Sequence, residues 1–351
     1  MKTIHTKANN SKLSGSRLVD KYGSERISLL LSRIRNKKPN QLVRTFFTRV
    51  PPFSLFGGGF YKVLFQTRLY GWRNITAKSL YQNDKQELDT FQQVTLKKLN
   101  KDGVVVLHLD DLSLDRNLLA RLNASARCPA VQQAEKLSGQ TLYNHKIRGI
   151  GRNIKDKHIP NTYLNFFLND KLLNIVNSYF GLCTRLNYID AWYNLPVDPN
   201  DLIATTELWH RDHEDKRIIK VFVYLSDVAE DMGPFSYMSG THSKGQGKFT
   251  WLPPPSPPKG VYLSGSDLER VQKSDEHSIK AYPGKPGTVI IADTSGFHKG
   301  GRAIDDPRHI LVAFFTSDAA VDRHRYRLPL DIDPGLLSPQ ACYALGLNKT
   351  V

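Results

Sequence analysis

Two histidines and an aspartate occupy positions that could hold a metal ion. His210 and Asp212 stand two residues apart, just before the largely apolar run 218–225. On a β-strand, side chains at i and i+2 project to the same side, so this imidazole and this carboxylate would point together. Charged groups beside a buried segment are costly unless they are paired or bound to a metal. A third candidate ligand, His298, follows the apolar run 288–292 of another predicted strand.

An arginine further along the chain indicates which kind of metal chemistry these residues could support. Two histidines and one carboxylate on one face of an iron ion leave three positions open, the arrangement used by non-haem Fe(II) oxygenases. Arg308 opens the apolar run 308–316, and its planar guanidinium suits a carboxylate bidentately. A dicarboxylate cosubstrate that chelates iron at one end needs such a cation at the other. We therefore predict Fe(II) and 2-oxoglutarate as cofactors, with Arg308 binding the far carboxylate.

Two further cations compete for a cofactor-binding role. Lys220 lies within the run 218–225, on the same side as Phe222 and Tyr224, where it is either a snorkelling lysine or a buried cation for an anion. Arg302 lies in the turn before Arg308 and is an alternative to it. His213 is expected to be an exposed turn residue. His242 is expected to pack or hydrogen-bond beside the predicted strands.

The elements that must position these residues change in type along the chain. Helical spacing predicts helices over residues 84–99, 112–126 and 169–181, with one strand over 104–109. Short β-branched and aromatic segments follow, separated by Gly, Pro and Asp; they cover residues 185–195, 207–210, 217–228, 234–240, 287–296 and 308–317. Several strands without intervening helices indicate a sandwich or barrel.

Composition limits the classes of protein. The chain has 351 residues, 40% of them hydrophobic, and its three cysteines form no C-x-x-C pair. A disulfide framework or structural zinc site is not expected, and a reducing, cytoplasmic location fits the cysteine usage. The sequence has no run of about 18 apolar residues, so no transmembrane segment is predicted. The N-terminus also lacks the apolar core of a secretory signal.

The distribution of charge and of proline along the sequence suggests that the chain has three parts. The net charge is +16, and residues 1–50 contain twelve Lys/Arg against Asp20 and Glu25. This basic arm could attract nucleic acid or an anionic surface, could be a solvated tail, or could act as a transit peptide. We predict a basic N-terminal extension over 1–85, partly helical or disordered, and a catalytic domain over 86–325. A Pro-rich insertion near 250–272 would form a loop or lid, and 326–351 would be a C-terminal tail.

Several segments resemble the phytanoyl-CoA dioxygenase-like family of Fe(II)/2-oxoglutarate-dependent oxygenases. They are "LWHRD", "KVFVYLSDVAEDMGPFSYMSGTHSKG", "GKPGTVIIADTSGFHKGG" and "DPRHILVAFF", and upstream "LKKLNKDGVVVLHLDDLSLDRNLLARLNA". The resemblance covers roughly residues 88–318. It implies a mainly β fold with flanking helices (α+β) around a double-stranded β-helix, the cupin-like jelly roll. It also implies O2 as oxidant, His210, Asp212 and His298 as metal ligands, and Arg308 as the residue that binds 2-oxoglutarate.

Two positions depart from the family pattern. Arg211 stands where relatives often have Gln, and Gly300 stands where they often have Ser.

The function expected is a dioxygenase that hydroxylates a small organic substrate, anionic or acyl in character. The alternatives are a related oxygenase that performs desaturation or cyclisation, a non-catalytic jelly-roll binding module, and a nucleic-acid-associated protein.

Overall fold

The computed structural model describes the chain from residue 69 to residue 347, with gaps. The described residues are 69–126, 146–150, 158–198, 200, 205–245, 262–263, 268–269, 278–320 and 326–347. The predictions for the basic arm 1–50 lie outside these residues, as does nearly all of the Pro-rich insertion. No helix in the described part is long and apolar enough to cross a bilayer.

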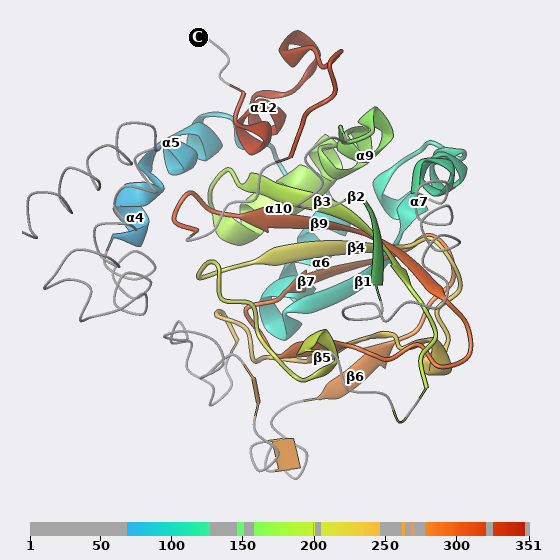
Figure 1. The fold of residues 1–351 in the computed structure, drawn as a ribbon. Helices are drawn as coiled ribbons and strands as arrows, with labels where there is room; N and C mark the ends of the chain where they lie inside the picture. Colours follow the sequence, from blue (N-terminus) through green and yellow to red (C-terminus); the bar gives the residue numbers. More distant parts are fainter. Residues whose placement is uncertain are drawn as a thin grey trace, which may run out of the picture. The chain divides into compact units, whose positions relative to one another are not determined.

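Two antiparallel sheets form the centre of the protein (Figure 1). The larger sheet has the order β1-β7-β4-β9-β3-β2, and its strands are β1 (Val104–His108), β2 (Lys146–Ile150), β3 (Arg185–Asn194), β4 (Ile219–Tyr224), β7 (Thr288–Asp293) and β9 (Arg308–Thr316). The smaller sheet has the order β6-β5-β8, with β5 (Phe235–Met238), β6 (Ile279–Tyr282) and β8 (His298–Gly300).

The order of the strands is that of a jelly roll. After β4 the chain crosses to the smaller sheet for β5 and β6, returns for β7, crosses again for β8 and returns for β9. The inner faces of both sheets contribute to one buried cluster, which includes Phe222, Phe235, Ile290 and Phe314. The predicted double-stranded β-helix with flanking helices is therefore confirmed.

Alternation along the strands determines which side chains enter the barrel. On β9, Ile310, Val312 and Phe314 belong to the interior cluster, whereas Leu311 and Phe315 belong to the cluster outside the larger sheet. Because the side-chain period of a strand is two, Arg308 falls on the inner side of β9. By the same rule, Lys220 falls on the inner side of β4 with Phe222 and Tyr224.

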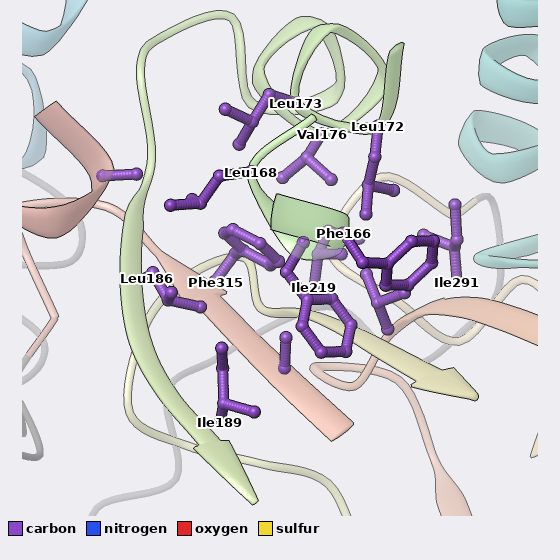
Figure 2. Close-up of a cluster of buried hydrophobic side chains, with 14 of the residues drawn as sticks. Phe166, Leu168, Leu172, Leu173, Val176, Leu186, Ile189, Ile219, Ile291 and Phe315 are labelled. Atoms are coloured by element: carbon purple, nitrogen blue, oxygen red, sulfur yellow. The ribbon is translucent and has the colours of Figure 1, made fainter. Parts of the chain in front are cut away.

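Helices cover the outer face of the larger sheet (Figure 1). They include α6 (Thr90–Asp102), α9 (Asn161–Phe167) and α10 (Asp170–Phe180). Leu172, Leu173 and Val176 of α10 face Ile219 and Phe315 of the sheet (Figure 2). Each of these side chains is essentially inaccessible to water, and burial of one such side chain contributes about 1.5–3 kcal/mol. This layer fixes the strands that carry the candidate site.

The caps of α6 explain why it starts and stops where it does. Asp89 accepts a hydrogen bond from the Gln92 backbone and the Gln92 side chain reciprocates, which makes a capping box. The predicted stop at "NKDG" is confirmed: Gly103 has φ +79°, the left-handed conformation that glycine adopts at low cost. A Cβ at Gly103 would lie 2.4 Å from the Tyr237 Oη and 2.6 Å from the His242 Nδ1.

We expect Gly103→Ala to lower the free energy of unfolding by roughly 2–5 kcal/mol, because left-handed strain and overpacking add. Gly181→Ala is the matched control. Gly181 also ends a helix with positive φ, but a Cβ there would meet nothing within 4 Å, so the strain alone should cost about 1–2 kcal/mol. Denaturant unfolding of both variants measures the difference. Equal losses would contradict the packing that we describe around Tyr237 and His242.

The fold departs from the prediction in several places. A short helix, α7 (Leu109–Leu112), precedes the helical turns that run from 118 to 126. The segment 207–210, predicted as a strand, has a 3₁₀ turn, η3 (Thr205–Glu207), and a single β-bridge at His210. The strands β2, β6 and β8 were not predicted as separate elements.

Segments that precede and follow the barrel strands in the sequence also pack against this part of the protein. Helices α4 (Tyr70–Arg73) and α5 (Ile75–Asn83) lie within the predicted extension. The Asn74 side chain between them accepts a hydrogen bond from the Asp318 backbone at 2.9 Å. In the predicted tail, α12 (Pro339–Leu345) is largely buried, and its Gln340 bonds to Asn177 of α10. The division of the chain at residues 85 and 325 stays a prediction.

Candidate metal centre

The structure brings His210, Asp212 and His298 together. One potential ligand atom from each lies within 4.8 Å of the others. His210 and His298 exchange two backbone hydrogen bonds, of 2.9 and 2.8 Å, which place their rings 4.4 Å apart. The Asp212 backbone donates to the Thr294 carbonyl at 2.8 Å. Main-chain pairing therefore fixes the segment that carries two of the side chains against the strand that carries the third.

Hydrogen bonds orient both imidazole rings. The His210 Nδ1 lies 2.7 Å from the Leu208 carbonyl oxygen, and the His298 Nδ1 lies 2.9 Å from the Gly296 carbonyl oxygen. A carbonyl accepts only, so we assign the proton to Nδ1 in each ring, which leaves the Nε2 lone pair as the metal-binding atom. The His298 Nε2 is 3.8 Å from the Asp212 Oδ2. This spacing suits two ligands of one ion.

The electrostatics of the three side chains favour a metal-binding protonation state. Burial, with His210 as a second cause, lowers the pKa of His298 to about 3, so its imidazole is neutral near pH 7. Burial alone would raise the pKa of Asp212, but Lys220, His298 and His210 hold it well below its usual value. Neutral imidazoles and an ionised carboxylate are the forms that bind a divalent ion. The donor set therefore fits Fe(II).

Lys220 lies next to the candidate metal ligand Asp212. Its Nζ lies 2.6 Å from the Asp212 Oδ2 and 5.2 Å from the centre of the Phe314 ring. Burial lowers the pKa of this lysine, but Asp212 more than offsets that effect, so the net shift is upward. The side of β4 that Lys220 shares with Phe222 and Tyr224 is the interior of the barrel, and the partner of Lys220 is a candidate metal ligand.

Arg308 is a buried cation whose hydrogen-bonding capacity is mostly unused. Its residue is 2% exposed, and burial lowers its pKa to about 10. Nη2 donates to the Gly301 carbonyl at 3.2 Å, while Nε and Nη1 have no hydrogen-bond partner among the described residues. Leaving buried charged donors without an acceptor is costly. An anion bound beside Arg308 would remove that cost.

The arginine lies within reach of the candidate ligands. A Cβ at Gly300 would be 3.6 Å from the Arg308 Nη2, and Gly300 follows His298 by two residues on β8. Two residues of a strand span about 6.6 Å, a distance that a five-carbon dicarboxylate can bridge. At Gly300 the family's common serine hydroxyl is missing, so the arginine lacks a neighbouring hydroxyl on this residue.

Arg302 has a different environment. Its Nε and Nη2 lie 3.1 and 3.0 Å from the Glu207 Oε2, and both side chains are mostly buried. This pairing compensates the charge of Arg302, which makes it a weaker candidate for a cosubstrate carboxylate. Sequence reasoning missed Glu207, because nothing near it in the sequence indicates that it would meet residue 302.

The remaining histidines near the barrel lie apart from the three candidate ligands. His242 is buried, and its Nε2 is 3.1 Å from the Asn100 carbonyl. The backbone of His213 bonds to the Glu214 carboxylate beside it. His309 is on the other side of β9 from Arg308, with its ring 5.7 Å from that of Tyr193. In the described residues, only His210, Asp212 and His298 form a cluster with metal-ligand spacing.

A comparison with protein families matches this part of the chain. The model described as phytanoyl-CoA dioxygenase matches residues 203–310, which include all three candidate ligands and Arg308. Over this segment the chain is similar to the phytanoyl-CoA dioxygenase family. It is a 2-oxoglutarate-dependent non-haem iron oxygenase, and its cofactors are Fe(II) and 2-oxoglutarate. The resemblance found in the sequence is confirmed.

Solved structures give a more distant likeness. The protein EctD from S. alaskensis, crystallised with 2-oxoglutarate and 5-hydroxyectoine, is 18% identical, with 72% of this chain and 84% of that chain covered and a TM-score of 0.47. The epimerase SnoN, in complex with Fe3+, alpha ketoglutarate and nogalamycin RO, is 13% identical, with 69% and 96% covered and a TM-score of 0.46. No curated protein matches the sequence.

Proposed function

We propose that the protein hydroxylates a small organic substrate, with Fe(II) held by His210, Asp212 and His298 and with 2-oxoglutarate bound by Arg308. The observation that carries the proposal is the buried Arg308 guanidinium, whose Nε and Nη1 have no partner among the described residues. This guanidinium lies beside Gly300, which follows His298 by two residues on β8. A metal site alone would not need such a cation. A cosubstrate with a second carboxylate does.

Each protein group has a defined task in this proposal. Iron, with 2-oxoglutarate and O2, supplies an oxidant able to remove hydrogen from an unactivated C–H bond. The carbonyls of Leu208 and Gly296 orient the two imidazoles, and Arg308 sets the direction of the cosubstrate. Side chains of the interior cluster exclude water from the reacting groups; they include Tyr188, Phe222, Tyr224, Phe235 and Phe314.

The identity of the carboxylate ligand favours hydroxylation over halogenation. Halogenases of the same fold have a small residue at the position of the carboxylate ligand, so that halide can bind iron. Here Asp212 is present and ionised near pH 7. Desaturation and cyclisation use the same ligands, and the product of the reaction distinguishes them from hydroxylation.

We propose an anionic or acyl substrate. The net charge of +16 raises the local concentration of anions at the protein surface, and the aromatic interior cluster suits an apolar portion of the same molecule. A carboxylate, an acyl thioester and a phosphorylated metabolite share this combination.

Substrate-stimulated formation of succinate tests the proposal. The protein, reconstituted with Fe(II) and supplied with 2-oxoglutarate and O2, should form succinate at a rate that rises when a substrate from an anionic metabolite collection is added. The product should carry one added oxygen atom, detected by mass spectrometry. A protein that binds Fe(II) and 2-oxoglutarate but forms no succinate with any compound would instead support the non-catalytic binding module.

A further inference from the structure

Lys220 is the closest charged neighbour of a candidate metal ligand. It lies on β4, is 8% exposed and faces the barrel interior. Its Nζ is 2.6 Å from the Asp212 Oδ2, and that oxygen is also the one 3.8 Å from the His298 Nε2. The ammonium group and a metal ion would therefore draw on the same carboxylate oxygen.

The position of Lys220 argues against a role at the far carboxylate of 2-oxoglutarate. Lys220 pairs with Phe314 across the sheet, six residues along β9 from Arg308. Six strand residues span about 20 Å, and the Lys220 ammonium is turned to Asp212 rather than along the strand towards Arg308. The two cations consequently serve different ends of the site.

Resting on the proposed function, we infer that Lys220 is a built-in counter-cation for Asp212. It neutralises the buried carboxylate when no metal is bound, and it competes with the metal for that carboxylate when one arrives. An ionised carboxylate buried without a partner is strongly destabilising. A protein that must fold before it acquires iron needs a positive charge at this position, and Lys220 supplies it from within the fold.

Competition for one carboxylate has a reciprocal consequence. If Lys220 weakens metal binding by some factor, metal binding weakens the Lys220–Asp212 pair by the same factor. Removal of the lysine charge should destabilise the metal-free protein and tighten its affinity for metal. A residue that only packs in the core would lower stability equally with and without metal.

The test is Lys220→Met, which keeps much of the side-chain volume and removes the charge. We expect its dissociation constant for Co(II), a redox-stable probe of the site, to fall by about 5- to 150-fold, the usual range for coupling between two sites. Its melting temperature without metal should fall by several degrees, and saturating Co(II) should raise it by more than it raises that of the wild type. Unchanged or weaker Co(II) binding would overturn the inference.

Lys244→Met is the matched control. Lys244 is also partly buried, and its Nζ donates to the Asn100 Oδ1 at 2.7 Å and to the Tyr179 carbonyl. Neither partner belongs to the candidate metal centre. This variant should lose stability by the same amount with and without Co(II), and its affinity for Co(II) should match that of the wild type.

Two further measurements keep the result interpretable. If Lys220→Met does not fold, Lys220→Gln retains a polar group that can donate to Asp212 and should show the same changes to a smaller degree. Titration of the wild type with Co(II) separates a failure of the proposed metal site from a failure of the proposed role of Lys220. Failure of the wild type to bind Co(II) would contradict the proposed metal site, whereas normal binding that is unaffected by either substitution would contradict the role of Lys220 alone.

Discussion

Replacement of Arg308 with alanine should weaken 2-oxoglutarate binding by about 30-fold to several-thousand-fold. The guanidinium is buried, and a charge-assisted bidentate pair in such surroundings is strong. Its disruption costs roughly 2–5 kcal/mol, and about 1.4 kcal/mol corresponds to a factor of ten. Anaerobic titration of the Fe(II) protein with 2-oxoglutarate, followed by the metal-to-ligand charge-transfer absorption, measures this affinity.

Two other substitutions make the Arg308 result specific. Arg308→Lys keeps the charge but loses the planar fork, so it should be impaired less than Arg308→Ala. Arg302→Ala serves as the matched control, because Arg302 is already paired with Glu207 at 3.0 Å. The control should bind 2-oxoglutarate like the wild type. Affinity of all three variants for Fe(II) without cosubstrate should barely change.

Other outcomes would redirect the assignment. Normal 2-oxoglutarate binding by a folded Arg308→Ala protein, together with loss of binding in Arg302→Ala, would transfer the role to Arg302. If neither substitution changes the affinity, the mode of cosubstrate binding that we propose is wrong. A general loss of structure is recognised by far-UV circular dichroism and by loss of Fe(II) binding in the same sample.

The main elements of the fold could be predicted because local signals agree with tertiary packing. Helix α10 has an Asn169 cap, an apolar face and a terminal Gly181, and the structure begins and ends it as predicted. The continuous apolar run of β9 reads as a strand because both faces of the larger sheet are covered. The short strand β8 has three residues and no periodicity to detect. Its existence depends on pairing with β5, which is a tertiary contact.

The candidate site shows the same limit. Residue type and spacing indicated His210, Asp212 and His298, and alternation placed Lys220 on the same side of its strand as Phe222 and Tyr224. The partner of Lys220 could not be predicted, because it depends on the tertiary placement of Asp212, whose backbone bonds to the Thr294 carbonyl. The pairing of Glu207 with Arg302 joins residues 95 positions apart. Such contacts leave no periodic pattern in the sequence.

Loss of any one of the three candidate ligands should nearly abolish metal binding. Removal of a hydrogen-bond partner of a ligand commonly costs 10–100-fold in metal affinity, so loss of a ligand itself should cost more than about 100-fold. We expect this for His210→Ala, Asp212→Ala and His298→Ala in anaerobic titration with Fe(II). The three losses should be similar, since each side chain contributes one ligand atom to the same cluster.

His242→Ala is the informative comparison, because His242 is as deeply buried as His298, at 2% against 3% exposed. Its Nε2 is engaged with the Asn100 carbonyl at 3.1 Å, so its side chain holds the end of α6 rather than a metal. The His242→Ala variant should be less stable than the wild type but should bind Fe(II) with wild-type affinity. His213→Ala should also bind Fe(II) with wild-type affinity, and its stability should not change. Loss of Fe(II) binding in His242→Ala, with Fe(II) binding retained in His298→Ala, would mean that His242 and not His298 is the third ligand.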